Sequence, residues 1–550
     1  MYLTGLHLPL YSLPFLQLSF FQASLCRLGP DTRFAYPNLP FTMRFTQIAS
    51  PALTLFACAA TVAAGDVTYV TVTSCEEAPE ATHPPSYDTS SSAVTVDVDL
   101  AVIGGGSGGI HAAIQLKDAG AKVVVIEKKN RIGGHAETFY APGGQPINAG
   151  VVVFENSTSV SSYFARLGVN STFFNPATDV PPGTPATKMY DFALGFPIPA
   201  QNESATQAQN TAILAAAQSY MTNVIAKYPW IDEGYLVPEP VPEELYMPFG
   251  ELAKKYSFEA LLPLLAQYNW FTGDIATIPA LYGIKGAGPG LLASLFGKFI
   301  VPSTRDTSTL YAAAAADLGD SVMLESTIVE VKRSGSGAGT NASSVTILIN
   351  QPNQPAKLIR AKKLLVAIPQ TLHNLASIDL SPEEEDIFGK FWGLGYWAGV
   401  VALPGLANSV RNIGVQTQYQ QPIIPGPSSI ELTAAPGFFT TSVGFNGLNY
   451  TEADGQDVIR AGLRRLEAVA AVPAGSATAA TFPFSSDHGP FNLRVSPEDI
   501  KNGFYGKLAK LQGQHNTYWT GAAFGSHNSA LIWNHNLVTI VPGLRKDLGL

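Results

Sequence analysis

Cysteine is nearly absent from this chain, with 3 residues among 550. Cys26 and Cys58 fall in an N-terminal stretch that has the features of a leader, so only Cys75 is expected in the mature chain. A single cysteine cannot form an internal disulfide. A fold held together by disulfides is therefore excluded.

Charge is scarce as well, since Asp, Glu, Lys and Arg together make up 14% of the chain. The net charge of −9 argues against nucleic acid and anionic membrane surfaces as partners, because both attract basic proteins. No H-E-x-x-H motif and no Cys/His cluster occurs, so no metal site is expected. The strongest functional pattern in the sequence is instead a set of glycine-rich segments.

The most informative stretch runs from Asp99 to Thr138. Leu100–Ile103 and Val123–Ile126 are apolar runs, each long enough for one buried parallel strand. Between them, a G-x-G-x-x-G turn opens a segment whose apolar residues follow helical spacing. Such a βαβ unit binds the phosphates of a dinucleotide at its turn and at the helix N-terminus. The predicted phosphate-binding residues are Gly104, Gly106, Ser107, Gly108 and Gly109.

A second glycine pair favours FAD among the dinucleotides. Glu127 stands at the end of the second strand, 18 residues after Gly109, where its carboxylate can accept hydrogen bonds from a ribose diol. Gly133 and Gly134 follow shortly afterwards. A glycine pair at this position lets the backbone pass close to the cofactor a second time. NAD does not need this second contact, whereas FAD, which lies extended through the protein, does.

This stretch resembles the N-terminal fingerprint of the flavin amine oxidase and phytoene desaturase superfamily. The resemblance covers residues 99–138 without a gap. The family usually carries arginine after the glycine pair, whereas this chain has His135, which resembles a fungal branch that includes β-cyclopiazonate dehydrogenase. Beyond the glycine turns, the matching residues are Ala113, Leu116, Gly120, Val123, Glu127 and Thr138.

The resemblance implies FAD as the cofactor and extends its site along the chain. It implies that the backbone at Ile328 contacts the adenine and that Gly521 approaches the ribityl chain or the diphosphate. A helix beginning near Ser529 would direct its N-terminus at the flavin pyrimidine. Asn148 and Gly150 match a hairpin beside the flavin loosely, and an ordinary surface turn is the alternative. The predicted cofactor-binding residues are Gly104, Gly106, Ser107, Gly108, Gly109, Glu127, Lys128, Arg131, Gly133, Gly134, His135, Ile328 and Gly521.

Covalent attachment of the flavin stays open. No cysteine lies near the C-terminal segment, which excludes the thioether link of some amine oxidases. His135, His488 or His527 could in principle be joined to the ring, although free histidines are the default expectation.

The first 64 residues are interpreted as a leader. Met43 is followed by a positive residue, an apolar run over 48–62 and small residues before position 65, which is the pattern of a secretory signal peptide. We expect residues 1–42 to come from an upstream start codon, 65–96 to form a linker, and the mature protein to be secreted. The alternative is one uncleaved apolar leader that anchors the chain. Five N-x-S/T sequons suggest a glycoprotein, at Asn156, Asn170, Asn202, Asn341 and Asn449.

The remaining length, about 480 residues, predicts two lobes. The FAD-binding domain is expected from residues 97–170, 286–375 and 500–550, and the substrate domain from 171–285 and 376–499. Helices are expected over 206–227, 243–256, 258–268, 291–299 and 458–472. Strands are expected over 321–332, 345–349, 357–359 and 363–368. One set of aromatic residues either walls a cavity or forms the core: Phe249, Tyr256, Phe258, Tyr268, Trp270, Phe271 and Tyr282.

The predicted fold is α/β, a two-lobe amine-oxidase-like flavoprotein with a Rossmann-type FAD-binding domain and an inserted α+β substrate domain. The predicted function is hydride transfer from a C–H bond of an amine or secondary metabolite to flavin N5, with oxygen or another acceptor taking the electrons. Tyr396 and Trp397 are candidate substrate walls, with strand packing as the alternative. No acid–base pair is recognised. An isomerase or cyclase without net oxidation, and a non-catalytic flavin-binding protein, remain alternatives.

Overall fold

The computed structural model describes residues 33–34, 41–50, 53–62, 67–71 and 94–550, except for 177, 180, 269–272 and 334–344. The chain divides into two units, Met1–Ser90 and Ser91–Leu550. The first unit contains an antiparallel sheet of β1 (Arg33–Phe34), β2 (Phe41–Ser50), β3 (Leu53–Val62) and β4 (Val67–Thr71), in that order. Residues 67–71, expected within a linker, therefore form a strand.

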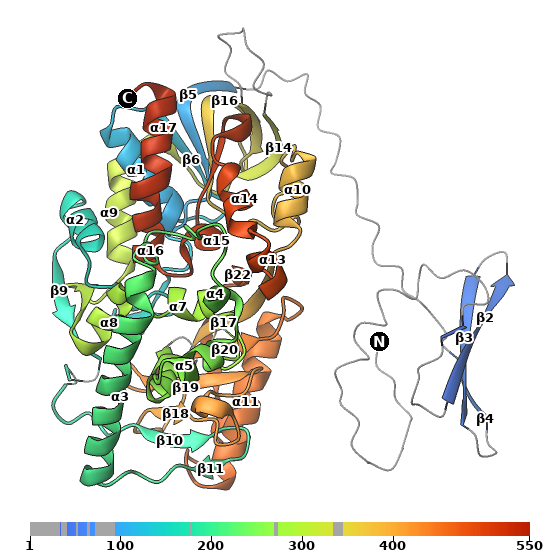
Figure 1. Ribbon diagram of the computed structural model, residues 1–550, viewed down its shortest axis with the longest axis vertical. Helices are drawn as coiled ribbons and strands as arrows, with labels where there is room; N and C mark the ends of the chain where they lie inside the picture. Colours follow the sequence, from blue (N-terminus) through green and yellow to red (C-terminus); the bar gives the residue numbers. More distant parts are fainter. Residues whose placement is uncertain are drawn as a thin grey trace. The chain divides into compact units, whose positions relative to one another are not determined.

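A seven-stranded sheet lies in the upper part of the second unit as drawn in Figure 1. Its middle strand β5 pairs in parallel with β6 on one side and with β16 on the other, and the end of β16 pairs in parallel with β23. The antiparallel strands β15 and β14 complete the opposite edge. The strands are β13 (Val322–Met323), β6 (Val123–Ile126), β5 (Val94–Ile103), β16 (Lys357–Val366), β15 (Val345–Asn350), β14 (Thr327–Arg333) and β23 (Thr517–Trp519).

The β5 and β16 strands are longer than the sequence predicts. β5 begins at Val94, inside the expected linker, because its apolar residues alternate from the start. β16 runs without a break, whereas two strands were predicted there. Its polar residues Arg360 and Lys362 are exposed on one face while Ile359 and Ala361 are buried on the other, so the alternation of a half-buried strand continues through them.

Helices cover one face of this sheet and bury Leu100 and Val102 of β5. The first helix after β5, α1, contacts α9, α16 and α17 directly, which brings the C-terminus of the chain onto the first βαβ unit (Figure 1). A π-helical turn joins the last two helices. These helices are α1 (Ser107–Asp118), α2 (Thr158–Arg166), α9 (Ser308–Leu318), α16 (Ser529–His535) and α17 (Val541–Leu548).

A second, mainly antiparallel sheet has eight strands. Its order is β11 (Phe196–Pro197), β10 (Lys188–Asp191), β18 (Val410–Asn412), β19 (Gly426–Leu432), β20 (Phe438–Phe445), β17 (Trp392–Ala402) and β21 (Thr481–Asp487), with β22 (Phe491–Arg494) paired to β17. Helix α11 (Glu452–Ala468) packs against it. This helix begins before the predicted Val458, because Thr451 and Asp454 form a capping box at its N-terminus.

A helical block follows β11 in the chain. The predicted helix over 243–256 is two helices, since Pro248 lacks the N–H that an unbroken helix needs. Phe249 and Phe258 are fully buried, so for them the core interpretation is correct. Trp270 and Phe271 lie outside the described residues. The block comprises α3 (Glu203–Asn223), α4 (Glu243–Tyr246), α5 (Phe249–Lys255), α6 (Leu262–Tyr268), α7 (Ala280–Lys285) and α8 (Pro289–Phe296).

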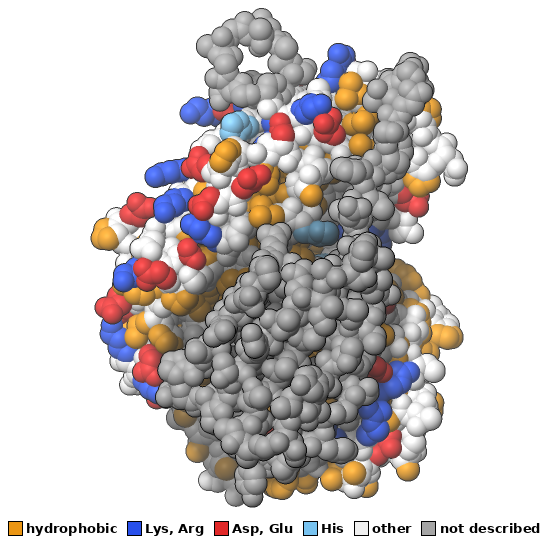
Figure 2. All heavy atoms as spheres, turned by 90° about the vertical axis from the view of Figure 1, so that its right-hand side faces the viewer, with side chains coloured by type: hydrophobic (Ala, Val, Ile, Leu, Met, Phe, Trp, Pro, Cys, Tyr) orange, Lys and Arg blue, Asp and Glu red, His pale blue; other side chains and the backbone are white. Residues whose placement is uncertain are grey.

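The remaining elements are short. They are β7 (Thr138–Tyr140), β8 (Pro146–Asn148), β9 (Ser171–Phe174), β12 (Phe299–Pro302), α10 (Pro382–Phe388), α12 (Ser476–Ala479), α13 (Pro497–Lys501), α14 (Phe504–Lys510) and α15 (Ala522–Gly525). On the face visible in Figure 2, acidic and basic side chains are interspersed rather than separated by sign. Among the described helices, none combines the length and apolar character that a membrane crossing requires.

Candidate functional site

The turn between β5 and α1 has the geometry of an anion-binding site. Gly104 has a φ of +104°, which L side chains rarely adopt, and a Cβ on Gly109 would lie 2.1 Å from the carbonyl oxygen of Gly104. Gly106 precedes the helix without any side-chain cap, and the first turn of α1 contains no acidic residue. The helix N-terminus therefore keeps its partial positive charge for a ligand.

The second glycine turn lies against the first. Gly134 has a φ of +58°, and a Cβ placed on it would come within 3.1 Å of the Gly106 Cα. Arg131 stabilises this turn by donating a hydrogen bond of 2.9 Å to the carbonyl oxygen of Gly134 and by pairing with Glu137. Arg131 thus stabilises the turn. The backbone around Gly104, Gly106, Gly109 and Gly134 is called the cradle below.

Glu127 and the start of β14 lie together at the far end of the cradle. The Glu127 carboxylate accepts hydrogen bonds from the N–H groups of Gly105 at 2.7 Å and Lys129 at 2.8 Å. The Ser326 N–H donates to the Glu127 carbonyl oxygen at 2.9 Å, which places Ile328 just beyond. Lys128 is exposed at the surface.

The C-terminal segment completes the cradle. Gly521 has a φ of +111° and follows directly after Thr520, whose N–H donates to the carbonyl oxygen of Val366 at 3.0 Å. The Ser107 hydroxyl donates to the Ser529 hydroxyl at 3.0 Å, and the Trp533 indole N–H donates to Ser107 at the same distance. Glycine turns from both ends of the chain therefore meet at one place.

Three histidines stack beside the cradle. The ring of His135 lies 4.3 Å from that of His488 and 5.9 Å from that of His527, measured between centroids, with interplanar angles of 12° and 8°. Phe491 extends the stack, 3.9 Å from His527, and Tyr396 lies 4.8 Å from Phe491. These residues come from four separate segments of the chain.

A buried carboxylate is paired with the stack. The Glu137 carboxylate lies 3.0 Å from Nε2 of His488, at hydrogen-bonding distance, and both side chains are almost completely buried. Lys129 donates to the other Glu137 oxygen at 2.9 Å, and Arg131 contacts it as well. Burial acts to raise the pKa of Glu137, but the hydrogen bonds from His488, Ser486 and Lys129 outweigh it and hold the pKa well below its ordinary value.

The other two histidines are held neutral. Burial lowers the pKa of His527 to about 3, and the neighbouring His488 and Arg494 add to this effect. Burial and the two neighbouring histidines also lower the pKa of His135 well below its ordinary value. Nδ1 of His527 accepts a hydrogen bond of 2.8 Å from the Asn492 N–H. Among the described residues, no group of three or more His, Cys, Asp and Glu side chains is placed to hold a metal ion.

The structure shows the surroundings of three residues whose interpretation the sequence left open. Trp397 is fully buried on the face of β17 opposite to Tyr396, where it packs against Phe482 and Gly455, so it belongs to the core of the second sheet. Asn148 accepts three hydrogen bonds, from Thr138 and Thr307, and so ties the hairpin down. Gly150 does lie at the stack, since a Cβ there would be 2.7 Å from His488 Cε1.

Comparison with known proteins is consistent with this geometry. Residues 102–167 match the model of an NAD(P)-binding Rossmann-like domain. The chain is 54% identical to the FAD-dependent oxidoreductase dpchF of Colletotrichum higginsianum, over 83% of this chain and 95% of that protein. It is 32% identical to the β-cyclopiazonate dehydrogenase of Aspergillus oryzae, over 80% of this chain and 92% of that protein.

The chain belongs to this family of FAD-dependent oxidoreductases. Solved structures share its fold. A fatty acid isomerase from P. acnes matches with a TM-score of 0.63 at 18% identity, over 80% of this chain and 98% of that one. A putrescine oxidase matches with a TM-score of 0.55 at 15% identity, over 82% and 98%. The predicted fold, the FAD cofactor and the class of FAD-dependent oxidoreductase are confirmed.

The cradle fits FAD on structural grounds. The uncapped helix N-terminus and the paired turns at Gly106 and Gly134 leave the backbone N–H groups unobstructed by side chains, as a diphosphate requires. The Glu127 carboxylate accepts one hydrogen bond on each oxygen, so each oxygen keeps a lone pair for a ribose hydroxyl. When bound, FAD supplies a two-electron acceptor for hydride.

Two further acidic residues of this oxidoreductase, Glu155 and Asp232, were not recognised as site residues from the sequence. Glu155 accepts a hydrogen bond of 2.5 Å from the Asn528 side chain, and Asn528 also caps α16 by accepting from the Ala530 N–H. Asp232 accepts from the Gly290 N–H at 2.9 Å. A Cβ on Gly290 would contact both carboxylates, at 2.3 Å and 3.1 Å. Only the tertiary structure brings these two acids together.

We expect Gly134→Ala to lose flavin. The added Cβ would press on Gly106 in a backbone conformation that already disfavours a side chain, and so would close the cradle. The matched control is Gly144→Ala, where φ is also positive, at +83°, but no atom lies within 4 Å of the added Cβ. The flavin-to-protein ratio, read from the visible and ultraviolet absorbance, should fall several-fold in the first variant only. Equal flavin-to-protein ratios in the two variants would contradict the role of Gly134 in binding FAD.

Glu155 should make the stability of the protein depend on pH. Burial, reinforced by Asp232, raises the pKa of Glu155 from 4.5 to about 8. Between these values the folded protein keeps a proton that the unfolded chain releases, so stability declines as the pH rises from about 4.5 to about 8. Glu155→Gln should remove this part of the decline in the thermal midpoint, whereas Glu383→Gln, at an exposed position, should leave the curve unchanged. Parallel curves for all three proteins would disprove the assignment.

Proposed function

We propose that this oxidoreductase dehydrogenates a small amine or secondary metabolite, with the hydride passing to flavin N5 and the proton to His488. The observation that carries the proposal is the buried pair of His488 and Glu137 in an aromatic stack beside the FAD cradle. The relative from Aspergillus oryzae named β-cyclopiazonate dehydrogenase supports removal of two hydrogens as the reaction class. Oxygen or another acceptor then takes the electrons.

The dyad has the arrangement that a proton acceptor needs. The Glu137 carboxylate faces Nε2 of His488 at 3.0 Å, which favours the tautomer with the proton on Nε2. Nδ1 then carries the lone pair and can take a proton from the substrate. The negative charge of Glu137 stabilises the imidazolium that forms, while Lys129 and Arg131 fix the carboxylate in place.

The surrounding rings position the substrate and exclude water. Tyr396 and Phe491 lie at the edge of the stack, where they present apolar faces to a flat substrate. His135 and His527 stay neutral, so they add hydrogen-bonding groups without adding charge. A dry, oriented site of this kind is what hydride transfer requires most.

We expect His488→Gln to retain flavin and to slow its reduction. A screen of amines and metabolites, scored by anaerobic bleaching of the bound flavin, first identifies a substrate. The variant keeps a donor for Glu137 but lacks a base, so bleaching should slow by about 10²–10⁴-fold. Photoreduction should proceed at the wild-type rate, and His373→Gln, at an exposed position, should bleach normally. Bleaching of His488→Gln at the wild-type rate would refute the role of the dyad.

We also propose that residues 43–64 direct the chain into the secretory pathway. The proposal is supported by the exposure of Asn156, Asn170, Asn202 and Asn449, the four sequon asparagines among the described residues. Expression from Met43 in a fungal host should give a secreted protein that begins near Gly65. Its mobility on a gel should shift after N-glycosidase treatment, by less in Asn449→Gln. Retention inside the cell with an intact N-terminus would contradict export.

A further inference from the structure

Arg494, the last residue of β22, is a buried cation without a hydrogen-bonding partner for Nη2. The side chain is almost completely buried, at 2% exposure. Its guanidinium lies over the rings of Trp392 at 5.0 Å and Tyr282 at 5.6 Å, and Nε donates to the carbonyl oxygen of Asn492 at 3.1 Å. These two aromatic rings and one carbonyl oxygen compensate only a small part of its positive charge.

No acidic residue balances this charge in the described part of the chain. None of the ion pairs among the described residues includes Arg494. The segments 269–272 and 334–344, which the structure does not describe, contain no Asp or Glu in the sequence. The charge on Arg494 is therefore not matched by a carboxylate within this unit.

The chain contains a direct contrast in Arg333. That guanidinium is similarly buried, at 6% exposure, but it donates to both oxygens of Glu384 at 2.8 Å and 2.7 Å and to Asp379 at 2.9 Å. A buried charge without such partners is costly, and proteins keep one mainly where a ligand supplies the missing charge. Arg494 has the environment of a binding residue, whereas Arg333 has that of a structural one.

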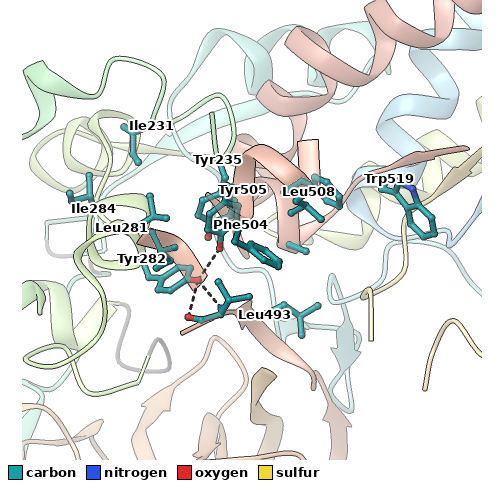
Figure 3. Packing of buried hydrophobic residues seen from close by; sticks show 14 of the residues in the cluster. Ile231, Tyr235, Leu281, Tyr282, Ile284, Leu493, Phe504, Tyr505, Leu508 and Trp519 are labelled. Atoms are coloured by element: carbon teal, nitrogen blue, oxygen red, sulfur yellow. Dashed lines mark hydrogen bonds between the residues drawn. The ribbon is translucent and has the colours of Figure 1, made fainter. Parts of the chain in front are cut away.

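The side chains near the guanidinium include tyrosines rather than acids. Figure 3 shows Tyr235, Tyr282 and Tyr505 gathered together, with the Tyr505 hydroxyl donating to that of Tyr282 at 2.9 Å. Burial raises the pKa of Tyr282 to about 12, so its hydroxyl stays protonated at physiological pH and cannot neutralise the cation. Their O–H groups are already used within the protein, because Tyr505 donates to Tyr282 and Tyr282 donates to the carbonyl oxygen of Val495 at 3.3 Å.

Arg494 also borders the proposed reaction site. Phe491 of the same strand belongs to the aromatic stack, and the Asn492 N–H donates to His527 at 2.8 Å. The charge of Arg494 contributes to the lowered pKa of His527, which reflects their proximity. A group bound at Arg494 therefore lies next to the rings that would hold the substrate.

We propose that Arg494 binds a planar organic anion on the substrate, a carboxylate or an enolate, and so orients the reacting C–H bond. This inference rests on the proposed function and specifies its substrate class as an organic acid. The guanidinium presents a fork of N–H donors that matches two oxygens of a delocalised anion. The neighbouring aromatic rings of Trp392 and Tyr282 suit the rest of a flat molecule.

The test uses the flavin-loaded protein with benzoate as the probe and benzamide as its neutral counterpart. Calorimetry gives both affinities directly, and the visible spectrum of the flavin reports binding near the cofactor. We expect wild type to bind benzoate at least about tenfold more tightly than benzamide, because only the anion pairs with Arg494. In Arg494→Met this preference should disappear, while flavin content stays at the wild-type level.

Thermal unfolding separates a binding role from a structural one. Removal of an uncompensated buried charge should leave the thermal midpoint of Arg494→Met unchanged or raise it. Arg494→Lys keeps the charge without the fork and should bind benzoate with intermediate affinity. The control is Arg460→Met, which removes a guanidinium stacked on Phe482 at 4.7 Å and should not alter benzoate binding.

Two results would overturn the proposal. They are equal affinity of wild type for benzoate and benzamide, and unchanged benzoate affinity in Arg494→Met; a lowered midpoint beside the second result would assign Arg494 a structural role. If the wild-type protein retains its flavin and is bleached by a substrate but shows no preference for the anion, the anion site fails while the proposed function stands. A protein that never binds flavin would refute the proposed function itself.

Discussion

The structure depends on how closely two turns of backbone can approach each other. Gly106 and Gly134 face one another at a distance that a single Cβ would disturb, and Gly134 adopts a backbone conformation that favours glycine. This contact sets the start of α1 against the chain that leads to His135. The cofactor cradle and the histidine stack therefore share one covalent segment of about thirty residues, and the position of one fixes the position of the other.

Buried charge is organised differently in the cradle and in the substrate region. Glu137 is surrounded by Lys129, Arg131 and His488, so its negative charge is fully matched and the dyad is rigid. Arg494, a short distance along β22 from Phe491, has no such match. A satisfied ion pair holds a group in place, whereas an unsatisfied ion creates an affinity for whatever brings the opposite charge. Arg494 and the pair of Glu137 and His488 together suit a substrate whose anionic end binds Arg494 and whose other end loses a proton to His488.

The alternation of side chains along a strand explains the different fates of adjacent aromatic residues. Tyr396 and Trp397 are neighbours in sequence, and both are large enough to form a substrate wall. Because successive residues of a strand point to opposite faces, Tyr396 faces the stack and Trp397 is buried against α11. The sequence pattern allowed both interpretations, and only the position of the helix relative to β17 distinguishes them.

The sequence by itself determined the βαβ unit, the glycine turns and the FAD-dependent class, because these depend on residues close together in the chain and on backbone geometry that only glycine allows. For the same reason the sequence predicted the hairpin of β7 and β8 and the strand-to-helix turn at Gly521. Helix boundaries shifted where Pro248 or the Thr451 cap intervened. Tertiary structure alone decided the pairing of Glu137 with His488, the buried acids Glu155 and Asp232, and the isolation of Arg494. Their partners are dozens to hundreds of residues away, and the burial that gives them their chemistry arises only when the two sheets and the helical block pack together.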